Sequence, residues 1–112
     1  MNIQIFGLKK SFDTQKAERY FKERKINYQF IDLKLKDISK RELQSIKTAV
    51  GLNNLMDSGS KEYERLKLGS IRSPEIREEI LLKNPGLYRV PIVRNGKYAT
   101  VGYEPDIWAQ WE

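Results

Sequence analysis

The chain contains no cysteine and no histidine among its 112 residues. Without cysteine it can form no disulfide, no zinc–thiolate centre and no thiol nucleophile of its own. Without histidine it has neither a Ser–His catalytic pair nor an imidazole ligand for a metal. We therefore expect no metal site and no resident cofactor, and a large share of enzyme chemistry is excluded.

Long apolar runs are also absent. No segment of the sequence approaches the length of a membrane-spanning helix. The N-terminal stretch "MNIQIFG" lacks the basic region and apolar run of a secretory signal, so a cytoplasmic protein with no membrane association is expected. A chain of 112 residues, 39% of them hydrophobic, is large enough to bury one hydrophobic core without the help of disulfides or metal ions. We therefore predict a single domain over residues 1–112.

Acidic residues are scarce only in the first half of the chain. Residues 1–50 hold 12 Lys and Arg against 6 Asp and Glu, whereas residues 51–112 hold 9 of each, so the net charge of +6 arises in the first half. A basic half can mark a surface for nucleic acid or for an acidic protein. Because no nucleic-acid-binding motif accompanies the charge, a solvated lysine-rich face is favoured and no direct nucleic-acid binding is expected.

The first third of the sequence predicts a strand, a helix and a second strand. The alternation in "NIQIF" indicates a strand, and "YQFIDL" at 28–33 indicates another. Between them Ala17, Tyr20 and Phe21 follow helical spacing. A strand–helix–strand order within about thirty residues is typical of a parallel βαβ unit.

Three further helices and a hairpin are expected in the remainder. Ser39 and Glu42 form a capping box that begins the first helix, which ends at Gly51. The stretch 60–69 predicts a second helix, and 73–86, with Ser73 as cap and Ile76 facing inward, predicts a third. "VPIVRNGKYATVG" predicts a β-hairpin with a type I′ turn at Asn95-Gly96. The final "EPDIWAQWE" predicts a short helix whose Ile107, Trp108 and Trp111 cover the sheet.

This order of elements resembles the thioredoxin fold: an α/β arrangement of β-α-β, a helical insert and β-β-α around a mixed four-stranded sheet. Three segments narrow the resemblance to the ArsC/Spx family of arsenate-reductase-like proteins, and together they span nearly the whole chain. They are "FGLKKS" followed by Lys16-Ala17, then "LMDSGSKEYERL", and finally "NPGLYRVPIVRNGKYATVGY".

The resemblance places Ser11 where the family has its nucleophilic cysteine and Thr14 where the Spx branch has its second cysteine. It also implies that Asp57, Val90 and Tyr103 stand where arsenate reductases hold the oxyanion with three arginines. An aspartate in such a site repels an anion by roughly 1 kcal/mol or more at short range. Arsenate reduction is therefore disfavoured twice, through the missing thiolate and the missing clamp, and no thiol redox activity is expected.

Three interpretations of Ser11 remain open. In the first, it replaces a cysteine, by natural loss or by substitution, in a loop where Lys9 and Lys10 would have lowered the pKa of the thiol. In the second, the hydroxyl stabilises a thiol that a ligand supplies, with glutathione or a small thiol as co-substrate held between Ser11 and the Val90-Pro91 bond. In the third, Ser11 or Asp13 caps a helix and does nothing more.

The candidate site residues are Ser11 as the catalytic position, with substrate-binding positions at Lys9, Lys10, Thr14, Val90, Pro91 and Tyr103. The expected partner is a small thiol or a disulfide-bearing protein. An alternative function belongs to another class, because the Spx branch contains transcriptional regulators that bind the α-subunit of RNA polymerase. The basic first half suits such a partner, whereas the missing C-x-x-C switch argues against it.

Overall fold

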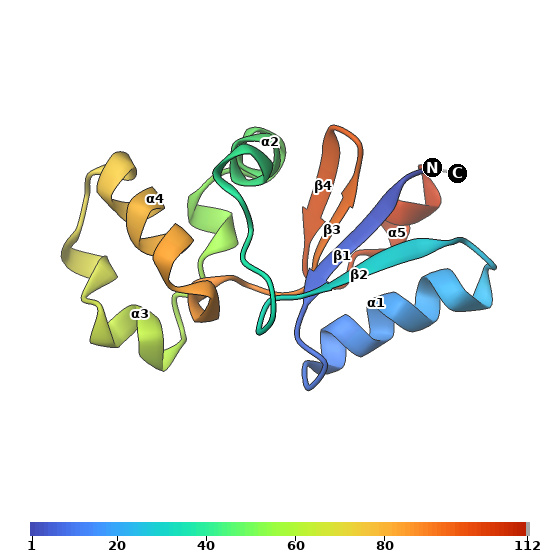
Figure 1. The fold of residues 1–112 in the computed structure, drawn as a ribbon, viewed down its shortest axis with the longest axis horizontal. Coiled ribbons are helices and arrows are strands. Elements are labelled where there is room, and N and C mark those ends of the chain that lie inside the picture. The colour runs from blue at the N-terminus through green and yellow to red at the C-terminus, as the bar shows by residue number, and fades with distance from the viewer. Residues whose placement is uncertain (112) are drawn as a thin grey trace.

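A mixed sheet of four strands forms the centre of the molecule (Figure 1). The computed structural model describes residues 1–111. Its strands are β1 (Ile3–Gly7), β2 (Tyr28–Asp32), β3 (Ile92–Asn95) and β4 (Tyr98–Val101). Its α-helices are α1 (Phe12–Glu23), α2 (Lys40–Val50), α3 (Lys61–Arg65), α4 (Pro74–Lys83) and α5 (Pro105–Ala109), and its 3-10 turns are η1 (Asn53–Leu55), η2 (Leu68–Ser70) and η3 (Pro85–Leu87).

The strands lie in the order β2-β1-β3-β4. β1 and β2 are parallel, whereas β3 runs antiparallel to both β1 and β4. The carboxyl ends of β1, β2 and β4 therefore meet the start of β3 at one edge of the sheet. This edge is where the loop from β1 to α1 leaves the sheet, at the bottom of Figure 1.

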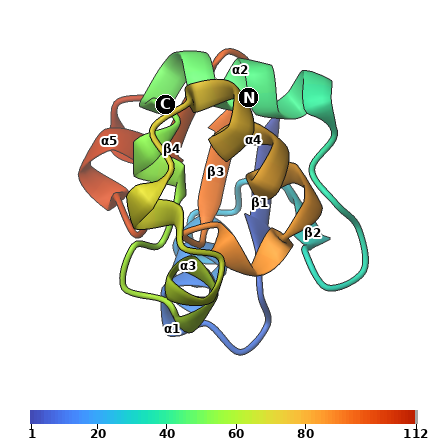
Figure 2. The same ribbon diagram turned by 90° about the vertical axis from the view of Figure 1, so that its left-hand side faces the viewer.

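Each face of the sheet carries its own hydrophobic core. Ile3 and Ile5 point to the face covered by α1 and α5, where Phe21 and Trp108 are buried. Phe6 points to the opposite face, where it packs in the core that α2 and α4 complete. The change of face between Ile5 and Phe6 follows from the period-two alternation of a strand. Figure 2 shows α3 and α4 in front of the sheet, on the side opposite to α1.

Local capping signals determine where the helices begin. The capping box is present, since Glu42 N–H donates to the Ser39 hydroxyl at 3.1 Å and Ser39 N–H donates to the Glu42 carboxylate at 2.9 Å. Ser73 caps α4, with Pro74 in its first turn. These starts agree with the sequence because caps act within one turn of the chain.

The sequence prediction of one helix over 60–69 was wrong, because the helix in the structure is shorter. α3 ends at Arg65, Lys67 adopts a left-handed conformation with φ of 56°, and η2 follows. The break carries Leu68 into the core, where it is fully buried. Burial of this leucine thus outweighs continuation of a five-residue helix, which has little stability of its own.

Two other details of the sequence prediction were also wrong. Asn95 pairs with Tyr98, so the two turn residues are Gly96 and Lys97, and positive φ at Gly96 without positive φ at Lys97 fits a type II′ rather than a type I′ turn. Ile76 and Ile107 are exposed by 49% and 42%, so neither faces inward as predicted. α4 and α5 each bury one narrow stripe, around Leu81 and Trp108.

None of the helices in residues 1–111 is long and apolar enough to cross a membrane.

Candidate functional site

The candidate site lies at the sheet edge where β1 ends and β3 begins. Phe6 pairs with Ile92, so continuation of the register sets Gly7 opposite Pro91. The Val90–Pro91 peptide bond is cis. Gly102 N–H, just after β4, donates to the Pro91 carbonyl at 2.8 Å. The β1–α1 loop, the start of β3 and the end of β4 are thereby brought to one place.

Ser11 is the N-cap of α1. Its backbone is extended, and its Oγ accepts a hydrogen bond from the Thr14 N–H at 3.2 Å. Of the two candidate caps, Ser11 and Asp13, the structure therefore selects Ser11. The cap uses only a lone pair of Oγ, so the hydroxyl proton of this half-buried side chain is still available to a ligand. Capping and ligand binding by Ser11 are compatible.

Thr14 lies beneath the loop, against the end of β1. Its side chain is fully buried, and its Oγ1 has no hydrogen-bond partner. A Cβ added to Gly7 would lie 2.6 Å from the Thr14 Cγ2 and 2.7 Å from its Oγ1, which is closer than atoms can approach. Glycine at position 7 thus lets the first turn of α1 approach the strand. Because Thr14 is buried, its side chain supports the loop rather than reaching an external ligand.

Lys9 and Lys10 are exposed on the loop that precedes Ser11. Neither forms an ion pair with a carboxylate within residues 1–111. The Lys9 carbonyl accepts a hydrogen bond from the Gln15 side chain at 2.8 Å, which ties the loop to the first turn of α1. Their charges add to the positive end of the helix dipole at Ser11. The loop is therefore an electropositive entrance to the site.

The backbone of Val90 is among the polar groups at this end of the sheet that make no backbone hydrogen bond within residues 1–111. On either side of it, the Arg89 N–H donates to the Leu55 carbonyl at 2.8 Å and the Pro91 carbonyl accepts from Gly102. By contrast, neither the N–H nor the C=O of Val90 makes a backbone hydrogen bond within the described part of the chain. An extended peptide passing this edge could pair with both groups.

Two positions proposed from the resemblance have other contacts. The Tyr103 ring packs edge-on against Trp108, with 5.6 Å between ring centroids, and lies 5.8 Å from the Lys16 Nζ. These are contacts to α5 and α1, along a pocket of about 180 Å³. The Asp57 carboxylate accepts from the Gly59 N–H at 3.2 Å, within the turn that leads to α3.

Arg89 is a candidate residue that the sequence allows to reach the mouth of the cleft, but that the sequence prediction treats by default as a surface charge and leaves out of the predicted site. Its guanidinium lies 3.9 Å from the position of a Cβ on Gly102 and donates to the Asn54 carbonyl at 3.4 Å. A positive charge therefore lies beside Gly102, which is bonded to Pro91, although the aligned position 90 is valine. The sequence signal for this residue is the order Arg-Val-Pro, in which the arginine stands one position before the aligned position 90.

The described residues offer little acid–base or metal chemistry. Burial raises the pKa of Tyr88 far above its usual range, and its hydroxyl has no hydrogen-bond partner. Burial and the hydrogen bond to Glu18 raise the pKa of Tyr28 to about 12. Both phenols stay protonated at neutral pH. Within residues 1–111, no group of three or more acidic, imidazole or thiol side chains is placed to share a metal ion.

Comparison with known proteins relates the chain to ArsC proteins both in sequence and in structure. Residues 6–111 match the profile of the ArsC family. An arsenate reductase from Vibrio cholerae superposes with a TM-score of 0.88 at 22% identity, covering 98% of this chain and 97% of that one. An arsenate reductase (ArsC) related protein from Brucella melitensis gives 0.74 at 20% identity, covering 99% and 94%. No match was found among curated proteins.

A more distant likeness concerns the fold alone. The glutaredoxin-like protein NrdH-redoxin from Escherichia coli superposes with a TM-score of 0.51 at 15% identity, covering 100% of this chain and 96% of that one. Together with the strand order, these superpositions confirm the predicted thioredoxin-like fold with its mixed four-stranded sheet.

Proposed function

The chain belongs to the ArsC family, and from this we propose that it is a thiol-free member that binds a thiol-bearing ligand rather than acting as a thiol-dependent reductase. The proposal rests on Ser11, which stands at the N-cap of α1 where we expect the nucleophilic cysteine of the family. The protein is related to arsenate reductases, yet its sequence contains no cysteine.

The chemistry of Ser11 separates binding from reduction. A cysteine at a helix N-terminus ionises near neutral pH, and its thiolate attacks disulfides and oxyanions. A serine hydroxyl stays protonated there, and the sequence has no histidine to activate it. The hydroxyl can nonetheless donate a hydrogen bond to a thiolate or carboxylate on a ligand. We therefore expect neither disulfide exchange nor arsenate reduction by this chain.

The single observation that carries the proposal is the Ser11 hydroxyl, which accepts from the Thr14 N–H and keeps its own proton for a ligand. The Val90 backbone supports it, because it makes no backbone hydrogen bond within the described residues and lies at the same end of the sheet. Both N–H and C=O of Val90 suit the extended backbone of glutathione or of a cysteine-containing peptide. Lys9 and Lys10 would attract the carboxylates of glutathione. We propose that the ligand backbone pairs with Val90 and that its sulfur lies at the Ser11 hydroxyl.

Titration calorimetry with glutathione tests this proposal. We expect saturable heat at millimolar glutathione, and an affinity roughly tenfold weaker for Ser11→Ala, because one hydrogen bond to a charged sulfur contributes roughly 1.5 kcal/mol. The matched control is Ser58→Ala, an exposed serine whose side chain makes no hydrogen bond within the described residues. It should bind as the unaltered protein does. No heat at millimolar glutathione, or equal loss in both variants, would contradict the proposal.

One observation favours a second function. The excess positive charge lies in residues 1–50, which would favour an acidic protein partner. As in the Spx branch, this partner would be the α-subunit of RNA polymerase. A pull-down with that subunit separates the two functions. Retention that survives Ser11→Ala and is lost on Lys9→Gln/Lys10→Gln would support the regulator, whereas a glutathione-binding protein should not be retained.

A further inference from the structure

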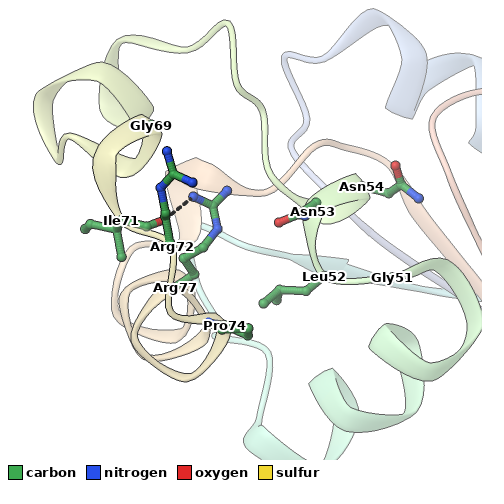
Figure 3. Close-up of a pocket in the computed structure, with 9 residues that line it drawn as sticks. All are labelled: Gly51, Leu52, Asn53, Asn54, Gly69, Ile71, Arg72, Pro74 and Arg77. Carbon is green, nitrogen blue, oxygen red and sulfur yellow. Dashed lines mark hydrogen bonds between the residues drawn. The ribbon is translucent and has the colours of Figure 1, made fainter.

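A pocket of about 790 Å³ opens on the helical side of the molecule, away from the Ser11 edge (Figure 3). One wall is the segment that follows α2, with Leu52 and Asn53. The other wall is the segment from η2 into α4, with Ile71, Arg72 and Arg77. In Figure 1 these segments lie in the left half, whereas the loop of Ser11, between β1 and α1, lies at the bottom near the middle. The pocket therefore lies away from Ser11, although it shares Asn54, whose carbonyl accepts from Arg89, with the surroundings of the first site.

Arg77 carries a positive charge that no carboxylate balances. Its Nη1 donates to the Leu68 carbonyl at 2.6 Å and to the Ile71 carbonyl at 2.9 Å, while Nη2 contacts the Met56 sulfur and the Tyr63 hydroxyl. Its Nε is buried without a partner. All its partners are neutral, and it forms no ion pair within residues 1–111. These bonds hold the guanidinium rigidly in the pocket wall.

Arg72 adds a second positive charge to the same wall. Figure 3 shows the guanidinium groups of Arg72 and Arg77 both on the side contributed by the segment before and within α4. Arg72 is exposed, and its side chain makes no hydrogen bond or ion pair in the described region. It is therefore free to turn toward a ligand. Two unbalanced guanidinium groups on one wall repel each other, and a bound anion would relieve that repulsion.

Among the described residues, no acidic side chain lines the pocket. Glu75 and Glu78, which follow the lining residues Pro74 and Arg77 in sequence, line an adjoining pocket that shares Leu52 and Pro74 with this one. Their carboxylates have other partners there, since Glu75 accepts from the Ser73 hydroxyl at 3.0 Å and Glu78 pairs with Lys47 at 2.7 Å. Burial of a positive charge without an anion is costly, so proteins usually pair such groups. Arg77 is partly buried and its partners are all neutral, so an anion supplied from outside the chain would balance its charge.

The remaining lining indicates what else the ligand carries. Leu52, Ile71 and Pro74 are apolar, and they can cover the uncharged body of an organic molecule. Asn54 donates its amide to the Val50 carbonyl at 2.6 Å, which leaves its side-chain oxygen as an acceptor. The planar fork of arginine matches the oxygens of phosphate and carboxylate.

We propose that the pocket between the segment after α2 and the start of α4 is a second binding site, for a small organic anion whose phosphate or carboxylate group accepts hydrogen bonds from Arg72 and is attracted by the charge of Arg77, whose own Nη N–H groups are already bonded within the fold. The apolar part of the ligand lies against Leu52 and Ile71. Arg77 is the rigid, structural half of the anion site, and Arg72 is its mobile half.

Amide chemical-shift mapping with phenyl phosphate tests the proposal. We expect saturable shifts at Asn53, Ile71 and Arg72, and no saturable shifts there with the neutral analogue phenol. Arg72→Gln should weaken phenyl phosphate roughly tenfold, the effect of losing one charge-assisted contact. Arg72 is exposed and makes no bond in the described structure, so this variant should fold. Benzoate, run in parallel, identifies the preferred headgroup, and saturable binding of either anion supports the proposal.

The matched control is Arg41→Gln, which removes the same charge from an exposed position in the first turn of α2. It should change the affinity by no more than about twofold, as expected for a screened surface charge. The proposal is overturned if both variants weaken binding equally, if Arg72→Gln has no effect, or if the shifts lie outside the pocket. Equal binding of phenol would overturn it as well.

Discussion

Substitution of Ser11 by cysteine should produce a thiol with a pKa near 7. Two structural terms lower it from the ordinary value of about 8.5. The Thr14 N–H, 3.2 Å from the Ser11 Oγ, would donate to the thiolate. The N-terminus of the 12-residue helix α1 adds the positive end of its dipole. Together they favour the thiolate by roughly 2 kcal/mol, or about 1.5 pKa units.

The assay is a pH titration of thiolate absorbance, supported by alkylation rates. At pH 7 the thiolate fraction should rise from about 3% for an ordinary thiol to about half. Because a thiolate of lower pKa is also a weaker nucleophile, alkylation should be roughly three- to fourfold faster. Lys9→Gln/Lys10→Gln in the Ser11→Cys background should raise the pKa by only a few tenths, because both lysines are exposed.

The matched control is Ser39→Cys. Ser39 caps α2 in the same way, with its Oγ 3.1 Å from the Glu42 N–H, but the Glu42 carboxylate also bonds the Ser39 backbone. The nearby negative charge offsets the dipole, so this thiol should have a pKa closer to 8.5. An ordinary pKa for Ser11→Cys, or equal values for the two variants, would refute the view that the Ser11 loop is built to hold a thiolate.

Three further outcomes follow from individual contacts. Thr14→Val should raise the free energy of unfolding by up to about 1 kcal/mol, measured by thermal unfolding, because it removes a buried hydroxyl that has no partner. A clear loss of stability would show that the Thr14 Oγ1 is hydrogen-bonded. Gly96→Ala should destabilise by about 1 kcal/mol in urea unfolding, because φ at Gly96 is 60° and nothing lies within 4 Å of the added methyl group, so only backbone strain acts. Glu78→Gln should cost about 1 kcal/mol at pH 7. The Lys47 Nζ at 2.7 Å holds the pKa of Glu78 below its ordinary 4.5, so its stabilisation is present above pH 4.5 and lost as the pH falls through the lowered pKa. The two proteins should then converge in acid, and a constant difference across the pH range would contradict this.

Features determined within one turn of the chain could be predicted from the sequence. The caps at Ser39 and Ser73 and the strand alternation through Ile3 and Ile5 depend on neighbours in sequence, and the structure contains all of them. The break at Lys67 could not be predicted, because it depends on where Leu68 finds room in a core built from distant segments. The turn at Gly96-Lys97 also depends on the pairing of β3 with β1, which sets the register.

In the candidate site, too, some features could be predicted from neighbours in sequence, whereas others depend on contacts between distant segments. The sequence identified Ser11 and Pro91, but the assignment of Tyr103 followed an aligned position, and its ring contacts α1 and α5. Arg89 was left out of the predicted site because the one-residue displacement in Arg-Val-Pro removes it from the alignment while the fold returns its guanidinium to Gly102. The pocket with Arg72 and Arg77 joins residues some twenty positions apart from Leu52, and no sequence motif marks it.

The sequence by itself determined the order of strands and helices, the absence of thiol and imidazole chemistry, and the serine at the start of α1. These follow from residue identity and from interactions a few residues apart. Only the tertiary structure decided that Ser11 keeps its proton free while capping, and that, within residues 1–111, the Val90 backbone makes no backbone hydrogen bond and Arg77 lies in a pocket without a carboxylate. The physical reason is that burial and hydrogen-bond satisfaction are set by distant parts of the chain, which the fold alone brings into contact.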